Sequence, residues 1–443
     1  MKEFIISNNY KYIELNSDIE FYPILEGYLA KGYIISDAIY LAVELQKGPL
    51  FVLLSYLHID NPDSNIKEKL RELDPHLAVE LPDFSDTLLN IDGEIRENFG
   101  YQARFISRDR VIKKHYDRIA LMILDGLGEN VLFNNLAEDS FLRRHYHKTI
   151  HAIYPSTTAA ATTSIISGLT PLESGWVGWE NYFPELKRNI VLFNGMDFDT
   201  GEPLGVTGFD KLPYKPFYHD MDIKCEQIMP DFNIYPYDFN ISLNKSIRLF
   251  KENKKMLQYI YCTNPDSIMH GSGAYSQKCK DFLAKLDKDI EAYSKRLPEN
   301  TLIIISADHG HTNVDELHLY AFRSLNSMLR RRPCNEGRCL VFDVKDECKP
   351  QFEDLFNKVY GNIYRLYKTE EAIERGFFGI NNKYIHERID GFLGNYVALA
   401  TSSYFFKFIP DRPGDKIIFK SHHAGITRNE MLIPIILIDS EDK

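Results

Sequence analysis

Four apolar runs constrain the fold of this chain more than any other feature. They occur in "DRIALMILDGLG" from residue 117, "MLQYIYCTNPD" from 256, "NTLIIISADHG" from 300 and "MLIPIILID" from 431. A run that is apolar at successive positions is typical of a central parallel strand covered by helices on both faces. A helix-like stretch, "SQKCKDFLAKLDKDIEAYSKRL", separates two of the runs. The sequence therefore predicts a doubly wound, mostly parallel α/β sheet flanked by helices.

The chain is expected to divide into two parts. Residues 116–443 contain the four apolar runs and form the predicted main domain. Residues 1–115 alternate short apolar and polar segments, such as "AIYLAVEL" and "PLFVLLSYLHI", and are predicted to form a small N-terminal accessory α/β region.

Acidic residues or histidines follow three of the predicted strands. Asp125 follows the first, Asp266 and His270 follow the second, and Asp308 and His309 follow the third. Each alone has an ordinary explanation, since an aspartate after a strand often caps the next helix. Because carboxyl ends of parallel strands meet at one edge of a sheet, we expect the set to converge there.

Carboxylates and imidazoles in such a set indicate divalent metal ions. Asp266 and His270 are spaced to lie on one face of a helical turn, and His422 and His423 precede the last strand. These groups suffice for two ions, and two ions roughly 3.5–4 Å apart are the common arrangement for displacement at phosphorus.

The segment "YPSTTAAATTSIISG", residues 154–168, places threonines ahead of a run of small residues. One interpretation is an N-cap on a closely packed helix. The other is a threonine nucleophile at the positive end of that helix. A threonine hydroxyl stays protonated at neutral pH, so this second interpretation requires a nearby metal ion.

Composition excludes some classes of partner. A net charge of −11 argues against binding a nucleic-acid polymer through bulk electrostatics. The apolar runs are shorter than the roughly 18 residues of a membrane span, and the N-terminus becomes polar too early for a secretory signal. Six scattered cysteines indicate reduced thiols. We expect a cytoplasmic protein that does not bind a membrane.

Five motifs, taken in order, resemble the alkaline phosphatase superfamily and in particular its nucleotide pyrophosphatase/phosphodiesterase branch. They are "LDGLG", "TTAAATTSIISGLTPLESG", "NPDSIMHGSG", "SADHGHT" and "SHHAGIT". The resemblance spans about residues 118–434. It implies two divalent ions, zinc with manganese as the alternative, one held by Asp125, Thr158, Asp308 and His309 and the other by Asp266, His270 and His423.

The same resemblance implies the nucleophile. Counting back from Gly168 gives Thr158, with Thr157 as the alternative, and "HAGIT" favours His423 over His422. It also implies that residues 312–420 form an insert that covers the substrate.

Substrate-binding residues are less well defined. The branch has an asparagine after the nucleophile segment; a gapless count reaches Trp179, and the nearest asparagine is Asn181. Trp176 and Trp179 could stack on a nucleobase or simply pack a loop. Arg338 could reach the site from the insert or lie on the surface.

The resemblance predicts hydrolysis of phosphate diesters or nucleotide pyrophosphates through a covalent phosphothreonine. Monoesterases need an extra cation for the second phosphate charge, and no arginine lies near Thr158 in the sequence, which favours diesters. The alternatives are a phosphomonoesterase or phosphonate hydrolase of the same superfamily, and a catalytically silent relative that binds a nucleotide.

Overall fold

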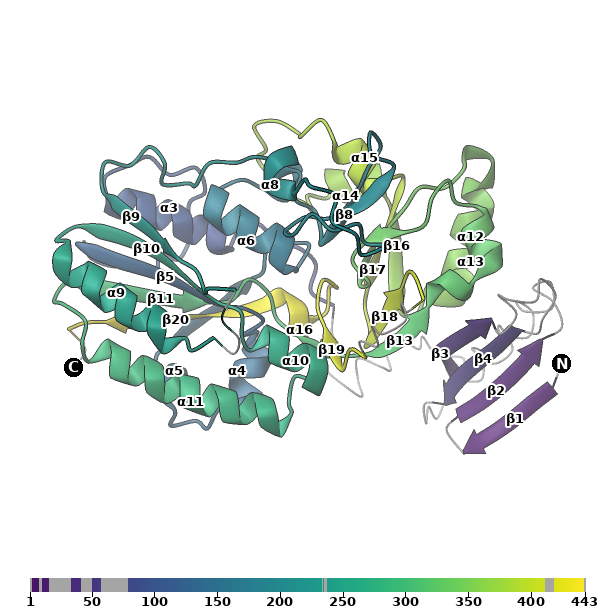
Figure 1. The fold of residues 1–443 in the computed structure, drawn as a ribbon, viewed down its shortest axis with the longest axis horizontal. Coiled ribbons are helices and arrows are strands. Elements are labelled where there is room, and N and C mark those ends of the chain that lie inside the picture. Colours follow the sequence, from purple (N-terminus) through teal and green to yellow (C-terminus); the bar gives the residue numbers. More distant parts are fainter. Residues whose placement is uncertain are drawn as a thin grey trace.

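The protein is described by a computed structural model (Figure 1). The structure describes residues 79–232, 234, 237–410 and 418–441, together with the backbone of four N-terminal strands. These strands form an antiparallel sheet in the order β1-β2-β4-β3, with bounds Lys2–Ser7 (β1), Tyr10–Leu15 (β2), Tyr33–Tyr40 (β3) and Leu50–Tyr56 (β4). The remainder of the accessory region predicted before residue 79 lies outside the described residues.

A six-stranded sheet in the order β6-β20-β11-β5-β10-β9 organises the main domain. Neighbouring strands among β9, β10, β5 and β11 pair in parallel, whereas β20 runs antiparallel to both β11 and β6. The bounds are Arg118–Leu124 (β5), Tyr146–His151 (β6), Lys224–Ile228 (β9), Met256–Cys262 (β10), Thr301–Ser306 (β11) and Leu432–Asp439 (β20). The predicted mostly parallel α/β fold is confirmed.

The apolar runs form the strands because both faces of the sheet are covered. Strands β10 and β11 are buried at every position, and β5 at all but its first. Helices α3 and α6 cover one face, and α4, α5, α9 and α11 gather on the other (Figure 1). Their bounds are Leu88–Asn98 (α3), Glu129–Asn135 (α4), Phe141–Arg144 (α5), Thr158–Ser167 (α6), Asn240–Glu252 (α9) and Gln277–Ser294 (α11).

The direction of β20 is set by the segment before it. The chain comes from β19 (Ser421–His422) through the short helix α16 (Arg428–Met431), which is too brief for a crossover back to the opposite edge. It therefore enters β20 from the edge where β5, β10 and β11 end, and must run against them.

Helix α3 shows that the main core extends further toward the N-terminus than predicted. Thr87 closes a capping box at its start, and Leu88, Ile91 and Ile95 are buried in the same core as β5. Within the described residues, the predicted boundary after residue 115 thus does not separate two cores.

A second six-stranded sheet, antiparallel throughout, follows the order β16-β17-β15-β14-β7-β8. Four of its strands come from the predicted insert, residues 312–420, and two from the segment after α6. The bounds are Glu180–Phe183 (β7), Arg188–Val191 (β8), Cys334–Asn335 (β14), Cys339–Phe342 (β15), Tyr364–Lys368 (β16) and Tyr396–Ala400 (β17).

Short elements connect the two sheets and cover the second one. They are α7 (Pro171–Ser174), α8 (Gly208–Lys211), α10 (Asp266–Ser272), α12 (Arg323–Ser327), α13 (Lys349–Tyr360), α14 (Thr369–Glu374), α15 (Ile389–Leu393), β12 (Thr312–Asn313), β13 (Asp315–His318) and β18 (Tyr404–Lys407). Two 3-10 turns, Leu319–Ala321 and Asp346–Cys348, complete the set. Among the described helices, none has the length and apolar character that crossing a membrane requires.

Candidate metal centre and active site

Strands β5, β10 and β11 end at nearly the same position in the sheet, so the residues that follow them lie close together. Leu124 at the end of β5 pairs with Cys262 at the end of β10, and Ile123 pairs with Ser306 at the end of β11. The backbone N–H of Asp125 then donates to the carbonyl of Cys262, and the N–H of Asp266 donates to the carbonyl of Asp125 (both 2.9 Å). Parallel register therefore determines where the first two aspartates lie.

The first group of donor atoms surrounds the His309 imidazole. His309 Nε2 lies 3.2 Å from Thr158 Oγ1, 3.4 Å from Asp125 Oδ1 and 3.5 Å from Asp308 Oδ2. His309 Nδ1 donates to the carbonyl of Gly310 (2.9 Å), so Nε2 has its lone pair free for a ligand. The structure thus places together the four residues predicted for one ion.

In each of the two carboxylates of this group, one oxygen accepts hydrogen bonds from the protein and the other oxygen accepts none. Asp308 Oδ1 accepts from the N–H groups of Gly126 (3.2 Å) and His309 (3.0 Å), and Asp125 Oδ2 accepts from the hydroxyl of Tyr261. Asp125 Oδ1 and Asp308 Oδ2 are buried and accept no hydrogen bond from any described residue. Buried, unpartnered carboxylate oxygens are costly unless a cation pairs with them.

The second group surrounds Asp266 Oδ1. His270 Nε2 lies 3.3 Å away and His423 Nε2 3.7 Å away, as predicted for the other ion. A third imidazole, His311, is closer still, with Nε2 at 2.7 Å. Asp266 also lies within reach of Asp125 and His309, so the two groups adjoin.

Backbone carbonyls orient two of these imidazoles. His270 Nδ1 donates to the carbonyl of Ser421 (3.0 Å), and His423 Nδ1 donates to the carbonyl of Ser156 (3.2 Å). Each bond selects the tautomer that leaves Nε2 free to bind a metal. The second bond also joins the segment before α6 to the last motif of the chain.

The donor spacing fits divalent ions. Ligands at about 2.0–2.1 Å from a tetrahedral ion lie about 3.3 Å from one another. The distances from His309 Nε2 are 3.2–3.5 Å, and those from Asp266 Oδ1 to His270 and His423 are 3.3 and 3.7 Å. Carboxylate and imidazole donors at this spacing suit zinc and similar ions.

The acidic groups titrate abnormally because they are buried together. Burial, with the charges of Asp308 and Asp266 added, raises the pKa of Asp125 well above its usual range. Burial also raises the pKa of Asp308. Burial would raise the pKa of Asp266 too, but His270 and His311 outweigh it and hold that pKa well below its usual range. The Asp125–Asp308 pair is therefore the part of the site that most needs added positive charge.

The imidazoles of His311 and His423 are neutral at physiological pH, as metal ligation requires. Burial lowers the pKa of His311 to about 4 and that of His423 well below its usual range. His270 differs: burial opposes its protonation, but Asp266 raises its pKa.

Helix α6 presents Thr158 to the first group. Thr157 is the N-cap and Thr158 the first helical residue, so the hydroxyl lies at the positive end of the helix. Residues Ala159, Ala160 and Ala161 are fully buried, which lets the helix pack closely. Thr157 thus occupies the N-cap position that the first interpretation expects, although its hydroxyl donates to Glu336 and makes no cap bond to the helix, and the nucleophile stays a prediction.

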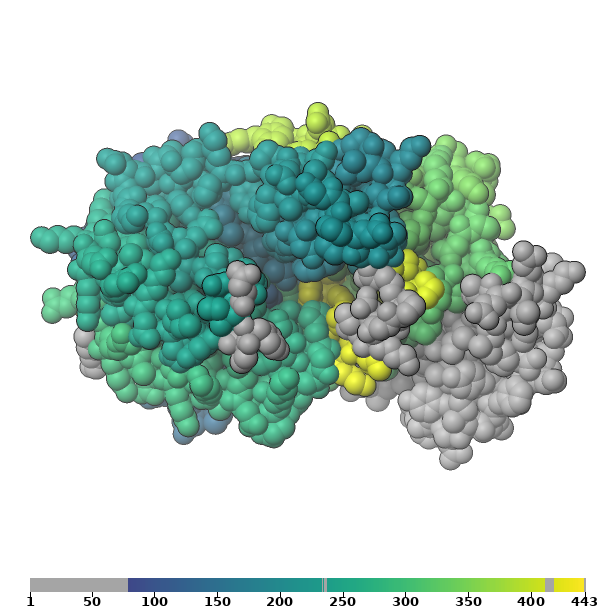
Figure 2. Space-filling model, in the orientation of Figure 1, coloured from purple at the N-terminus to yellow at the C-terminus, as the bar shows by residue number. Residues whose placement is uncertain are grey.

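Thr158 opens onto a cleft of about 440 Å³ between the two sheets. In Figure 2 the yellow segment near the C-terminus, which supplies part of the lining, reaches the surface below the blue-green segment. Apart from Thr158 and the other metal-ligand candidates, the lining is mainly aromatic and comes largely from the predicted insert: Asn335, Glu336, Phe405, Phe406, Lys407 and Phe408, with Trp179 and Phe198 from the preceding segment.

Of the substrate-binding candidates, only Trp179 lines the cleft. Trp176 is fully buried in the second sheet's core, where its Nε1 donates to the carbonyl of Leu212 (3.0 Å). Asn181 is fully buried on β7 and its Nδ2 donates to the carbonyl of Gly175 (3.4 Å). The loop after α6 folds back to start the second sheet, so Trp176 packs in the core, as the second of its two alternatives expects, and neither Trp176 nor Asn181 reaches the cleft.

Arg338 does not reach the cleft either. It is fully buried and binds both oxygens of Glu430 (2.6 and 2.7 Å) and the carbonyls of Ser402 and Tyr404. Neither the predicted substrate contact nor the surface alternative is correct, since Arg338 joins the second sheet to α16, the short helix before β20.

Two residues at the site were missed from the sequence. His311 stands in "SADHGHT", where the repeated histidine was an available signal. Glu336 carried no signal, because its place depends on how the β14–β15 turn lies against α6.

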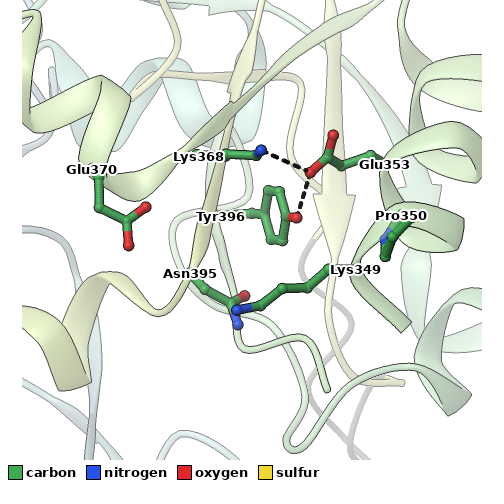
Figure 3. A pocket seen from close by; sticks show the side chains of 7 residues that line it. All are labelled: Lys349, Pro350, Glu353, Lys368, Glu370, Asn395 and Tyr396. Atoms are coloured by element: carbon green, nitrogen blue, oxygen red, sulfur yellow. Dashed lines mark hydrogen bonds and ion pairs between the residues drawn. The ribbon is translucent and has the colours of Figure 1, made fainter. Parts of the chain in front are cut away.

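A separate surface pocket of about 380 Å³ lies on α13, β16 and β17 (Figure 3). Its charged groups neutralise one another: Lys368 pairs with Glu353 at 3.6 Å, and the Tyr396 hydroxyl donates to Glu353 at 2.5 Å. None of the metal-ligand candidates lines it.

Comparison with known proteins agrees with this geometry. The family model for type I phosphodiesterase/nucleotide pyrophosphatase matches residues 119–390. Ectonucleotide pyrophosphatase/phosphodiesterase family member 1 is 26% identical in Homo sapiens and 24% in Mus musculus over 182 residues. That match covers 37% of this chain and only 20% of each relative.

Solved structures share the fold. Murine ectonucleotide pyrophosphatase/phosphodiesterase 5, in an inactive variant with a threonine replaced by alanine and in complex with AMP, aligns with a TM-score of 0.52 and 15% identity, covering 72% of this chain and 87% of that one. The human protein aligns with the same score and identity, covering 73% and 88%.

The family match, together with the fold and the Asp/His groups at the sheet edge, makes the chain a member of the alkaline phosphatase superfamily. Within it, the chain belongs to the type I phosphodiesterase/nucleotide pyrophosphatase family.

We expect replacement of His311 by glutamine to weaken binding of the ion at Asp266 about 10- to 100-fold. The imidazole holds the Asp266 carboxylate in place, and loss of such a supporting contact typically has this effect. Competition with a chromophoric chelator would measure the affinity. The matched control is His145→Gln, since His145 lies at the end of α5 and its Nδ1 bonds to the carbonyl of Phe141, outside the site. Equal affinities in both variants would contradict the prediction.

Proposed function

We propose that the protein is a metal-dependent hydrolase of phosphate diesters or nucleotide pyrophosphates, with Thr158 as its nucleophile. The observation that carries the proposal is the position of Thr158 Oγ1, 3.2 Å from His309 Nε2 and beside the unpartnered oxygens of Asp125 and Asp308. Membership of the family supports the same chemistry.

Two divalent ions are proposed, one at Asp125, Thr158, Asp308 and His309 and the other at Asp266, His270 and His423, with His311 holding the Asp266 carboxylate in place. When bound, such ions lower the pKa of a hydroxyl and stabilise charge on a leaving oxygen. The donor set suits zinc, with manganese as the alternative.

The protein's own residues would carry the phosphoryl group. Thr158 loses its hydroxyl proton to solvent and its Oγ1 attacks phosphorus; the bond from phosphorus to the leaving oxygen breaks, and the leaving group departs with the electron pair of that bond and takes up a proton from solvent. The N-terminal end of α6 faces the phosphoryl oxygens and favours their charge. Water then cleaves the phosphothreonine bond and restores the Thr158 hydroxyl.

The aromatic lining of the cleft favours a substrate whose ester group is flat or apolar. Trp179, Phe405 and Phe408 supply aromatic surface beside Thr158. A nucleotide fits this description, and the murine neighbour was solved with AMP.

Elemental analysis of purified protein, paired with hydrolysis of bis-(p-nitrophenyl) phosphate, tests the proposal. We expect about two metal ions per chain and diesterase activity that is lost on chelation and restored by zinc. Two ions with activity only on monoesters or phosphonates would favour the alternative hydrolases of the superfamily. No metal and no activity would favour a silent relative that binds a nucleotide. The cytoplasmic location stays a prediction, which fractionation of the source cells would test.

A further inference from the structure

Glu336 is a buried carboxyl placed beside the proposed nucleophile. It lies on the turn between β14 and β15, is only 5% exposed, and lines the cleft together with Thr158. Its Oε1 accepts from the hydroxyl of Thr157 (2.5 Å) and from the backbone N–H of Trp179 (2.8 Å). These two bonds hold the carboxyl against the first turn of α6.

No arginine or lysine of the described residues forms an ion pair with Glu336. Lys407 is the one lysine or arginine among the residues that line the cleft, and it pairs with Glu316 (3.6 Å). Arg338, two residues from Glu336, is bound to Glu430. Burial accordingly raises the pKa of Glu336 to about 7, although the bonds from Thr157 and Trp179 oppose the rise.

We propose that Glu336 is a specificity-determining residue that makes this cleft select monoanionic phosphate diesters over dianionic phosphate monoesters. The inference rests on the proposed function, and it further specifies the net charge of the phosphate ester that the same site prefers.

The argument is electrostatic. A phosphate monoester loses its second proton at a pKa of about 6, so it carries close to two charges at neutral pH, whereas a diester carries one. Above pH 7 the Glu336 carboxyl is mostly ionised, and a carboxylate in a cleft of low dielectric opposes the extra charge more strongly than it would in water. A site built for monoesters would instead present an arginine or a free lysine there. The aromatic wall of Trp179, Phe405 and Phe408 suits the second ester group of a diester.

Glu336→Gln isolates the charge. The amide oxygen of glutamine can still accept from Thr157 and Trp179, so the position of α6 is retained while the negative charge is removed. Glu336→Ala removes both the charge and the two hydrogen bonds. Glu353→Gln is the matched control, because it makes the same change in net charge in the pocket of Figure 3, away from the cleft.

The test compares kcat/KM for p-nitrophenyl phosphate and bis-(p-nitrophenyl) phosphate, which share a leaving group, with metal content measured for every variant. We expect E336Q to raise the monoester-to-diester ratio at least about tenfold, with E353Q unchanged. E336A should raise the ratio as well but lower both rates, because Thr157 loses its partner. An E336Q ratio within twofold of the parent, at equal metal content, would overturn the inference.

Failure of the proposed function gives a different result. If the metal-loaded parent hydrolyses neither ester, the same comparison is made by calorimetric binding of phenyl phosphate and diphenyl phosphate. A tenfold gain in the relative affinity of E336Q for phenyl phosphate would then support the inference without any turnover, and an unchanged ratio would overturn it.

Discussion

Replacing Thr158 by alanine is expected to lower hydrolysis of bis-(p-nitrophenyl) phosphate by at least about 10³-fold, since loss of an enzyme's nucleophile typically removes this much or more. The methyl group cannot attack phosphorus or carry it covalently. Steady-state rates at saturating metal would measure the loss, and elemental analysis would show how many ions the variant retains.

Two further variants make this prediction specific. Thr158→Ser keeps a hydroxyl at the same position and should retain part of the activity. Thr157→Ala removes the hydroxyl that donates to Glu336 but leaves the nucleophile, and we expect at most a tenfold loss. An active T158A with an inactive T157A would show that the nucleophile is one residue earlier.

The second large effect is expected on stability. Arg338→Met should lower the free energy of unfolding by about 3–5 kcal/mol, because Glu430 would remain buried without its counter-charge. Glu430 also accepts from the backbone N–H of Gly425 (2.7 Å) and the hydroxyl of Thr427 (2.5 Å). The loop that carries His423 should therefore loosen, and metal binding should weaken with it.

Urea denaturation of the metal-loaded protein would measure the loss for R338M. The double variant R338M/E430Q removes the unpaired charge and should be less destabilised than R338M alone. A stable R338M with reduced kcat/KM would instead show that Arg338 acts on the substrate.

The sequence was sufficient to identify the metal-ligand candidates, because each lies at the end of a buried strand or in a short motif beside one. Continuous apolar runs select parallel strands, parallel strands end at one edge, and Asp125, Asp266, Asp308 and His309 follow directly. The order of the motifs identified the family, which the family model confirmed.

The cleft opposite those residues could not be predicted in the same way. It is formed by the second sheet, whose strands come from two segments more than a hundred residues apart and carry no motif. For Trp176 the sequence left substrate stacking and packing open, and for Arg338 it left a substrate contact and a surface position open; packing places both in the interior. Glu336 went unnoticed for the converse reason, since nothing local distinguishes it from a surface glutamate.

The sequence by itself determined the α/β class, the sheet edge at which the site lies, and the group of acids and imidazoles that converge there. These features follow from local rules. A continuous apolar run predicts a parallel strand, and the common direction of parallel strands places the residues that follow them at one edge of the sheet. Only the tertiary structure decided that β20 runs antiparallel, that His311 joins Asp266, and that Glu336 lies next to Thr157. Each of these depends on contacts between distant segments, which local pattern does not encode.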